Sequence, residues 1–378
     1  MPPKAVYVHI PFCPNKCHYC DFTAYLVRGQ PVDAYLDALE KEMERTVKET
    51  PPDVIHSIYI GGGTPTVLTP SQMERLLTAI RFYFPNWTEN VEFTVEANPG
   101  TLQEPLLATM LKGGVNRISL GAQAFQSTLL QKIGRIHSVQ EIERSVHLVR
   151  SLGFSNLSLD LMFGLPDQTV SDFYESLLAA VKLKPDHLSC YSLKIESGTR
   201  FHDQYEKGML PLPTEDEEVE MYELARSFLS EAGYTQYEIS NFAREAKQSQ
   251  HNLVYWRNED YYGFGAGAHG YVEGVRHENV KGIQEYIQML QVGVLPRAHA
   301  FPVSRQEQME NFMILGLRLL EGVSRKRFFQ LYQKELDEVF GVAIFDLQKK
   351  GLLISEGDRL RLTEKGILFG NEVFAAFL

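Results

Sequence analysis

Short apolar runs and longer amphipathic segments alternate through the first 200 residues. Strand-like apolar runs occupy residues 5–10, 57–63, 91–99, 117–123, 157–166 and 187–195. Between them lie segments such as VDAYLDALEKEMERTV and PSQMERLLTAIRFYF, whose apolar positions recur with the period of a helix. Six strand–helix steps of this length predict a parallel sheet with helices outside it, so we expect an α/β fold.

The number of steps limits the kind of sheet. Six strands are fewer than the eight of a complete (β/α)8 barrel, so we expect an open, partial (β/α)6 barrel, with a doubly wound open sheet as the alternative. In both folds the chemistry lies at the carboxyl ends of the strands. The most distinctive residues fall at or near these ends, namely Cys13, Gly61 to Thr64, Glu96, Gln123 and Asp160.

The pattern changes after about residue 199. A helix is predicted over residues 215–232 and a strand within GYTQYEIS. The aromatic- and glycine-rich stretch 251–271 is too irregular for a helix and predicts a site-forming loop. Further on, helices precede a hairpin that turns near Gly357, which suggests a mostly helical, winged-helix-like domain. The expected domains are residues 1–200 (partial barrel), 201–303 (barrel extension) and 304–378 (C-terminal domain).

Composition narrows the class of protein. The chain has 44% hydrophobic and 22% charged residues, as globular proteins do, and its net charge of −11 opposes general nucleic-acid binding. The N-terminus lacks the features of a signal peptide, and no apolar run reaches the roughly 18 residues of a membrane span. The cysteines do not form a disulfide framework, so we expect a cytoplasmic protein. Contact with a membrane surface is left open.

Three of the four cysteines, Cys13, Cys17 and Cys20, lie within CPNKCHYC. Three thiolates on a short loop suit an iron–sulfur cluster or zinc. Structural zinc normally takes four protein ligands, and although His18 lies inside the motif, such a loop surrounds a cube better than a single ion. A [4Fe-4S] cluster on three cysteines keeps one iron open to a small molecule. The alternative is three buried structural thiols. Cys190, in a predicted strand, is expected to be a core thiol.

The spacing CxxxCxxC after a first strand resembles the signature of the radical S-adenosylmethionine (SAM) superfamily. The resemblance implies that the open iron binds the amino and carboxylate groups of SAM, which is then cleaved to a 5′-deoxyadenosyl radical. GGGTPT, residues 61–66, resembles the glycine motif of that family. Gly62, Gly63 and Thr64 are therefore expected to support the methionine end of SAM, because glycines let the backbone approach a ligand closely.

Four phrases, YVHIPFC, GGGTPT, SLGAQAF and DLMFGLP, resemble one branch of that superfamily, the branch of oxygen-independent coproporphyrinogen III oxidase. Carboxylates suit the ribose hydroxyls of SAM, and an arginine suits a carboxylate. The resemblance implies SAM contacts at Tyr7, Tyr19, Glu96, Gln123, Arg135 and Asp160.

Two departures from the oxidase bear on function. Phe22 stands where the oxidase has a further cysteine, and the arm that precedes the first strand in the oxidase is missing here. Both features resemble instead the HemW family of haem chaperones, which also shows an HNxxYW motif. That motif is matched by His251, Asn252, Tyr255 and Trp256, and the resemblance covers essentially the whole chain.

The HNxxYW motif also suits haem on chemical grounds. Aromatic rings offer packing faces to a flat apolar ligand, and a histidine can bind iron. His251 is thus a candidate haem residue; the alternative is a hydrogen-bonded histidine in an aromatic cluster that packs two domains. The implied function is transfer of haem to an acceptor, expected to be a respiratory-chain haem protein. The alternatives are coproporphyrinogen oxidation, another radical SAM reaction or simple iron–sulfur binding, so enzymatic activity stays open. The implied cofactors are a [4Fe-4S] cluster, SAM and haem.

Overall fold

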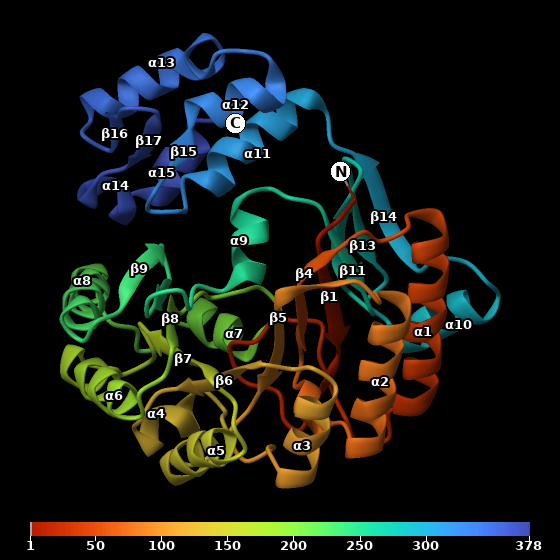
Figure 1. Ribbon diagram of the computed structural model, residues 1–378. Coiled ribbons are helices and arrows are strands. Elements are labelled where there is room, and N and C mark those ends of the chain that lie inside the picture. The colour runs from red at the N-terminus through yellow and green to blue at the C-terminus, as the bar shows by residue number, and fades with distance from the viewer. Residues whose placement is uncertain (1) are drawn as a thin grey trace.

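A 12-stranded sheet frames the protein, in the order β14-β13-β12-β11-β1-β4-β5-β6-β7-β8-β10-β9. It is seen in a computed structural model that describes residues 2–378 (Figure 1). Its central strands run parallel, each beside the next along the chain, which confirms the predicted partial (β/α)6 arrangement. These strands are β1 (Ala5–Ile10), β4 (Ile55–Gly62), β5 (Trp87–Ala97), β6 (Arg117–Gln123), β7 (Asn156–Phe163) and β8 (His187–Ser192).

Further strands extend the sheet at both edges. β11 (Tyr261–Phe264) pairs parallel with β1, and three antiparallel strands follow it. The opposite edge ends in two antiparallel strands beside β8. Within residues 2–378 no pairing joins β14 to β9, so the sheet is open. The added strands are β12 (His269–Val272), β13 (Val275–Asn279), β14 (Arg297–Pro302), β10 (Asn241–Ala243) and β9 (Thr235–Glu238).

Helices cover the outer face of the sheet (Figure 1). Several begin with a capping box, in which two side chains three residues apart accept hydrogen bonds from free backbone N–H groups of the first turn. Ser138 and Glu141 form such a pair at the start of α5. The helix predicted at 215–232 is confirmed as α8. The helices are α1 (Val32–Glu49), α2 (Pro70–Tyr83), α3 (Glu104–Lys112), α4 (Ser127–Lys132), α5 (Val139–Ser151), α6 (Val170–Lys182), α7 (Arg200–Glu206), α8 (Glu215–Glu231) and α10 (Ile283–Gln291).

The two faces of the parallel strands differ in chemistry. Residues such as Ile58, Ile118 and Leu159 are fully buried in the hydrophobic core. Their neighbours one position away, such as Tyr59 and Ser119, point to the opposite face, because side chains alternate along a strand. That inner face is largely polar. Cys190 lies in β8 among the core residues, which confirms its prediction as a core thiol.

The C-terminal part is mostly helical, as predicted, and lies beyond α9 at one side of the main sheet (Figure 1). A hairpin turns at Gly357, which has a φ of +57° and lies where the turn was expected. A third short strand completes this small sheet. The elements are α11 (Arg305–Gly316), β15 (Val323–Ser324), α12 (Arg325–Tyr332), α13 (Leu336–Lys349), β16 (Leu353–Glu356), β17 (Arg359–Leu362), α14 (Glu364–Leu368) and α15 (Gly370–Ala375).

The prediction of a loop over residues 251–271 is wrong. The segment forms α9 (Gln250–Trp256), β11 and β12. The Glu92 carboxylate, from β5, accepts hydrogen bonds from the backbone N–H groups of Gln250 and His251, both at 3.0 Å, and the Ser249 side chain caps the same end. A carboxylate at a helix N-terminus satisfies groups that the helix itself cannot. This partner lies far away in sequence, so the local pattern did not reveal it.

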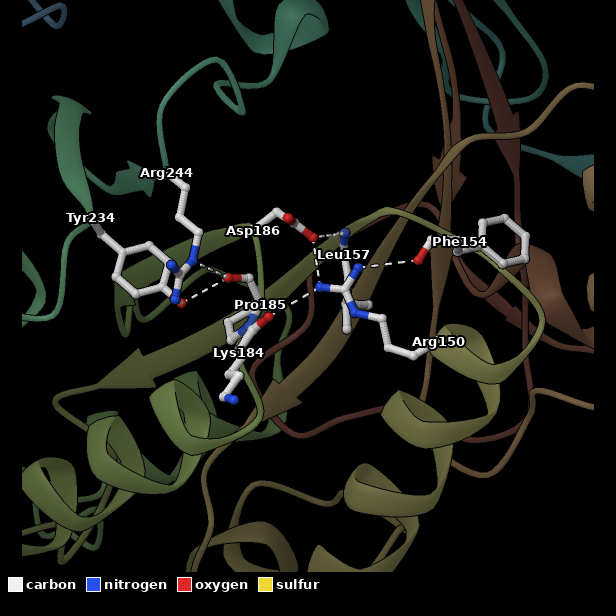
Figure 2. A network of polar contacts seen from close by, with 8 residues as sticks. All are labelled: Arg150, Phe154, Leu157, Lys184, Pro185, Asp186, Tyr234 and Arg244. Atoms are coloured by element: carbon white, nitrogen blue, oxygen red, sulfur yellow. Dashed lines mark hydrogen bonds and ion pairs between the residues drawn. The ribbon is translucent and has the colours of Figure 1, made fainter.

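A polar network lies at the amino ends of β7 and β8 (Figure 2). Arg150 donates to the backbone carbonyls of Phe154 and Lys184 and to the carboxylate of Asp186, which also accepts the N–H of Leu157. The network therefore ties two loops together at the end of the sheet opposite the cysteines. Figure 2 also shows Pro185, Tyr234 and Arg244.

In the part of the chain that the structure describes, no helix has both the length and the apolar character that a bilayer span requires.

Candidate functional site

A pocket of about 360 Å³ lies between the cysteine loop and the polar face of the parallel strands. Three predicted site residues, Tyr7, Thr64 and His251, do not line it. The structure brings the others together around this one cavity. They are Cys13, Cys17, Tyr19, Cys20, Gly62, Gly63, Glu96, Gln123, Arg135 and Asp160.

The cysteine loop is held from outside the pocket. Asn15 donates to the carbonyl oxygen of Gly134 at 2.7 Å. The His18 ring bonds the carbonyl oxygen of Lys132 through Nδ1 at 2.8 Å and accepts from Arg200 through Nε2 at 2.9 Å. Because both ring nitrogens are occupied, His18 anchors the loop and is not a fourth ligand in this arrangement.

Burial disfavours the charged thiolate form of Cys13 and Cys20 in this pocket. Burial raises the pKa of both, that of Cys20 to about 11. Metal ligation needs thiolates, so it would release protons here. Among residues 2–378 no three Cys, His, Asp or Glu side chains converge on a single-ion site. Soft sulfur donors spread around one cavity suit a body larger than one ion.

A chain of hydrogen bonds runs beside the loop. Asn98 donates to the Thr64 hydroxyl at 2.7 Å, and Arg135 donates to the Asn98 carbonyl at 2.6 Å and to the Tyr19 hydroxyl at 2.7 Å. The buried Nε of Arg135 has no partner among the described residues. A Cβ at Gly121 would lie 2.8 Å from the Gln123 amide, so this glycine keeps space open. A buried guanidinium with an unused donor fits a ligand carboxylate.

Two buried carboxylates line the strand side of the pocket. Glu96 accepts from the Tyr59 hydroxyl at 2.7 Å and from the N–H of Gly62 at 3.0 Å. Asp160 accepts from the Ser119 hydroxyl at 3.3 Å. Burial raises the pKa of both carboxyls. They can accept hydrogen bonds from the hydroxyl or ammonium groups of a ligand.

The glycines of the GGGTPT motif make room for the protein itself. Gly62 has a φ of +109°, and a Cβ there would lie 2.4 Å from the His9 ring. A Cβ at Gly63 would lie 2.6 Å from the carbonyl oxygen of Phe12. The expected reason for these glycines was approach to a ligand. The contacts show that they first admit the segment that leads into the cysteine loop.

Tyr7 lies one step behind the pocket. Its hydroxyl donates to Nδ1 of His9 at 2.9 Å, and Nε2 of His9 donates to the carbonyl oxygen of Thr23 at 2.8 Å. This relay holds the backbone just after the third cysteine. Tyr7 therefore supports the loop in this arrangement.

His251 lies in the wall behind Tyr59. Its Nδ1 bonds the Ser57 hydroxyl at 3.0 Å and its Nε2 bonds the Tyr255 hydroxyl at 2.8 Å. Its ring stacks on Tyr59, with centroids 5.1 Å apart. Burial lowers its pKa to about 3, so the ring is neutral. Both nitrogens are engaged within the protein, and neither is free to bind iron in this conformation.

Two other residues of the HNxxYW motif, Asn252 and Trp256, contact different parts of the molecule. Asn252 lines the pocket. The Trp256 ring lies 4.4 Å from the guanidinium of Arg318, which follows α11, and Arg318 also approaches the buried Glu238 at 3.7 Å. The motif therefore joins the pocket wall to the C-terminal helices.

Several pocket residues escaped the sequence analysis, which treated the strands as uniformly apolar runs. The signal was an alternation: polar residues recur at every second position, as in Arg117 and Ser119 or Ser189 and Tyr191. Such a period predicts a polar inner face. The polar residues missed in this way include Tyr59, Asn98, Arg117, Ser119, Ser189 and Tyr191.

Known proteins share this architecture. Residues 7–180 match the model of the Radical SAM superfamily, and residues 303–369 match that of the HemN C-terminal domain. The heme chaperone HemW of Bacillus subtilis (strain 168) is 46% identical over 375 residues, which cover 99% of each chain. This chain belongs to the HemW family. HemW of Lactococcus lactis subsp. lactis is 40% identical, over 100% of this chain and 97% of the relative. Membership in this radical SAM family confirms the predicted [4Fe-4S] cluster and SAM as cofactors.

A solved structure confirms the fold. Coproporphyrinogen III oxidase (HemN) from Escherichia coli superposes with a TM-score of 0.87, over 100% of this chain and 90% of its own. The two sequences are 24% identical, so the likeness concerns the fold and does not extend to the reaction.

Proposed function

We propose that this protein is a haem chaperone, which binds haem on a radical SAM framework and passes it to an acceptor haem protein. The observation that carries the proposal is 46% identity, along almost the whole chain, to a relative named heme chaperone HemW. The pocket mouth supports it. Phe22 is 64% exposed there, and Tyr25 and Leu26 line the same cavity. An exposed apolar rim suits a flat apolar ligand.

The cysteine loop holds the cluster in this proposal. Cys13, Cys17 and Cys20 bind iron, which leaves one iron without a protein ligand. When bound, the cluster and SAM together supply one-electron chemistry. The protein binds and orients SAM: Arg135 takes its carboxylate, and Glu96 and Asp160 accept from its ammonium or hydroxyl groups. The remaining proposed SAM contacts are Tyr7, Tyr19, Gly62, Gly63, Thr64 and Gln123.

His251 acts as a positioning residue in this proposal. It holds Tyr255 and stacks on Tyr59, which in turn donates to Glu96. Its neighbour Asn252 presents an amide to the cavity. The motif would thus serve haem through the shape of the wall, with His251 behind Tyr59 and not on the haem iron.

The proposal also covers the haem acceptor, the cellular compartment and the division into domains. The acceptor is a haem protein of the respiratory chain, and transfer takes place at the membrane surface. The chaperone itself works in the cytoplasm, where its four cysteines, none of which forms a disulfide, stay reduced. The proposed division into residues 1–200, 201–303 and 304–378 assigns cluster and SAM to the first part, and the HNxxYW motif to the second.

The second candidate is oxygen-independent coproporphyrinogen III oxidase. It is kept because four sequence phrases resemble that oxidase and residues 303–369 match the HemN C-terminal domain. Phe22 opposes it, since an apolar ring lines the pocket where the oxidase resemblance calls for a further cysteine.

One experiment separates the candidates. The cluster is reconstituted without oxygen, haemin is titrated into the protein, and coproporphyrinogen III is assayed in the same preparation with SAM and a reductant. One-to-one haemin binding without turnover is expected. Conversion of coproporphyrinogen, with only weak nonspecific haemin binding, would establish the oxidase.

A further inference from the structure

Arg117 is a buried cation on the strand side of the pocket, and among the described residues its guanidinium forms no ion pair. It begins β6 and is 2% exposed, yet it lines the pocket. The negative charges of Glu92 and Asp160 favour its charged form, but neither carboxylate forms an ion pair with it among residues 2–378. Its recorded hydrogen bond is a long one, from Nη1 to the Thr94 hydroxyl at 3.4 Å. Its Nε is buried and has no hydrogen-bond partner in the part of the chain that the structure describes.

The nearby acids are engaged elsewhere. Glu92 accepts from the Ser249 hydroxyl and from the first N–H groups of α9. Asp160 accepts from Ser119, and Glu96 from Tyr59. A guanidinium has five donors and stays charged in proteins. Burying it with one weak hydrogen bond is costly unless a further group enters the site.

We propose that Arg117 is the anion-binding residue at the inner end of the pocket, where it receives a carboxylate of the ligand. This inference rests on the proposed function: for haem the carboxylate is a propionate. Arg135 lies by the cysteine loop and serves the carboxylate of SAM, which leaves Arg117 for a second acidic ligand. Asn252, from the HNxxYW helix, lines the same cavity and has no recorded side-chain hydrogen bond within the described residues.

Position along the strand separates the two arginine sites. Arg117 begins β6 and Gln123, beside the SAM contacts, ends it. The Arg135 guanidinium lies beside Gly121, 3.6 Å from where a Cβ would stand, and at about 3.3 Å per residue the Cα atoms of Arg117 and Gly121 are roughly 13 Å apart. Two separate cations at the two ends of one cavity suit two acidic ligands better than one.

The test compares haemin with haemin dimethyl ester, whose propionates carry no charge. Wild type and Arg117→Met are titrated with both ligands and with SAM. Arg150→Met is the matched control, because Arg150 belongs to the network away from the pocket (Figure 2). Wild type is expected to bind haemin at least tenfold more tightly than the ester. Arg117→Met should lose that preference and bind the two ligands alike, as a double-mutant cycle requires. Arg150→Met should keep it.

Other outcomes overturn the assignment. Equal loss of haemin and ester in Arg117→Met would mean a structural role. Loss of SAM affinity with haemin unchanged would assign the site to SAM. If Arg117→Met fails to fold, Arg117→Lys replaces it. The wild-type protein alone also tests the proposal, because equal affinities for haemin and its dimethyl ester would refute an anion-binding residue. Absence of any haemin binding by wild type refutes the proposed function as well.

Discussion

The two ends of the pocket solve the same problem, a buried polar site, in opposite ways. At the cysteine loop, thiols from one short segment face the cavity and burial raises the pKa of Cys13 and Cys20. At the inner end, polar side chains from distant segments mostly satisfy one another, as His251 does with Ser57 and Tyr255. The need for a ligand is therefore visible in the composition of the loop, whereas at the inner end it shows only as a missing hydrogen-bond partner.

The largest expected effect is loss of the iron–sulfur cluster from the cysteine end of the pocket, with the inner end left intact. Cys17→Ala removes one of three iron ligands. The reconstituted protein should therefore lack the visible absorption of the cluster and should bind less than stoichiometric iron and sulfide. Haemin binding should remain at least in part, because the inner end does not depend on the cysteines. Anaerobic visible spectra and haemin titration measure both.

Cys190→Ala is the matched control for that experiment. Cys190 is buried in β8 behind the pocket, so its removal should leave the cluster intact. If haemin binding disappears in a folded Cys17→Ala protein, the two ends of the pocket are not separable.

The next effect concerns Arg135, which shares the loop end. Arg135→Met removes the donor to Asn98 and Tyr19 and the proposed partner of the SAM carboxylate. SAM affinity should fall at least tenfold, since charge-assisted pairs in buried sites are strong. Calorimetry on the reconstituted protein measures it, with the exposed Arg144→Met as control. Unchanged SAM affinity would remove Arg135 from the site.

Glu42 is a buried carboxyl outside the pocket, and its hydrogen bonds are all made within the protein. Glu42 accepts from the Tyr286 hydroxyl at 2.5 Å, from the N–H of Gly265 at 2.8 Å and from the Asn279 amide at 2.6 Å. Burial raises its pKa to about 7. The folded state therefore binds more protons than the unfolded state between about pH 4.5 and 7, and stability falls as pH rises through that window.

The size of that effect follows from the shift. A change from 4.5 to about 7 corresponds to roughly 3 kcal/mol of unfolding free energy. Glu42→Gln should flatten this part of the pH profile, measured by urea unfolding of the ligand-free protein, while Glu44→Gln on the surface of the same helix should not. An unchanged profile in Glu42→Gln would mean that another group titrates there.

The smallest effect tests His251. Because both ring nitrogens are held by the protein, His251→Ala should lower the unfolding free energy by about 2 kcal/mol and leave the position of the haem Soret band unchanged. Thermal unfolding and visible spectra of the haemin complex check both. A shifted Soret band at unchanged stoichiometry would make His251 an iron ligand after all.

Local patterns were sufficient for much of the protein. The alternation of runs predicted the six parallel strands, and CxxxCxxC predicted a thiolate site at the end of the first strand. Glu96, Gln123 and Asp160 were placed at strand ends from sequence alone, and the structure brings all three to one pocket. These predictions succeeded because side chains of a short segment, or at the carboxyl ends of neighbouring parallel strands, are close whatever the rest of the chain does.

Contacts between distant segments escaped the same reasoning. Glu92 and α9 lie more than 150 residues apart in sequence, yet the carboxylate caps the helix, so HNxxYW formed a helix where a loop was expected. Tyr7 and Tyr59 are paired across β1 and β4 and point to the same face, yet only Tyr59 lines the pocket, which no local pattern could show.

Sequence alone thus predicted the six strand–helix units, the cysteine site and the resemblance to the family. Only the tertiary structure decided which polar residues are satisfied and which, like Arg117, still lack a partner. The physical reason is that a strand's own period fixes which face a side chain points to, whereas its hydrogen bonds depend on which segments pack opposite that face.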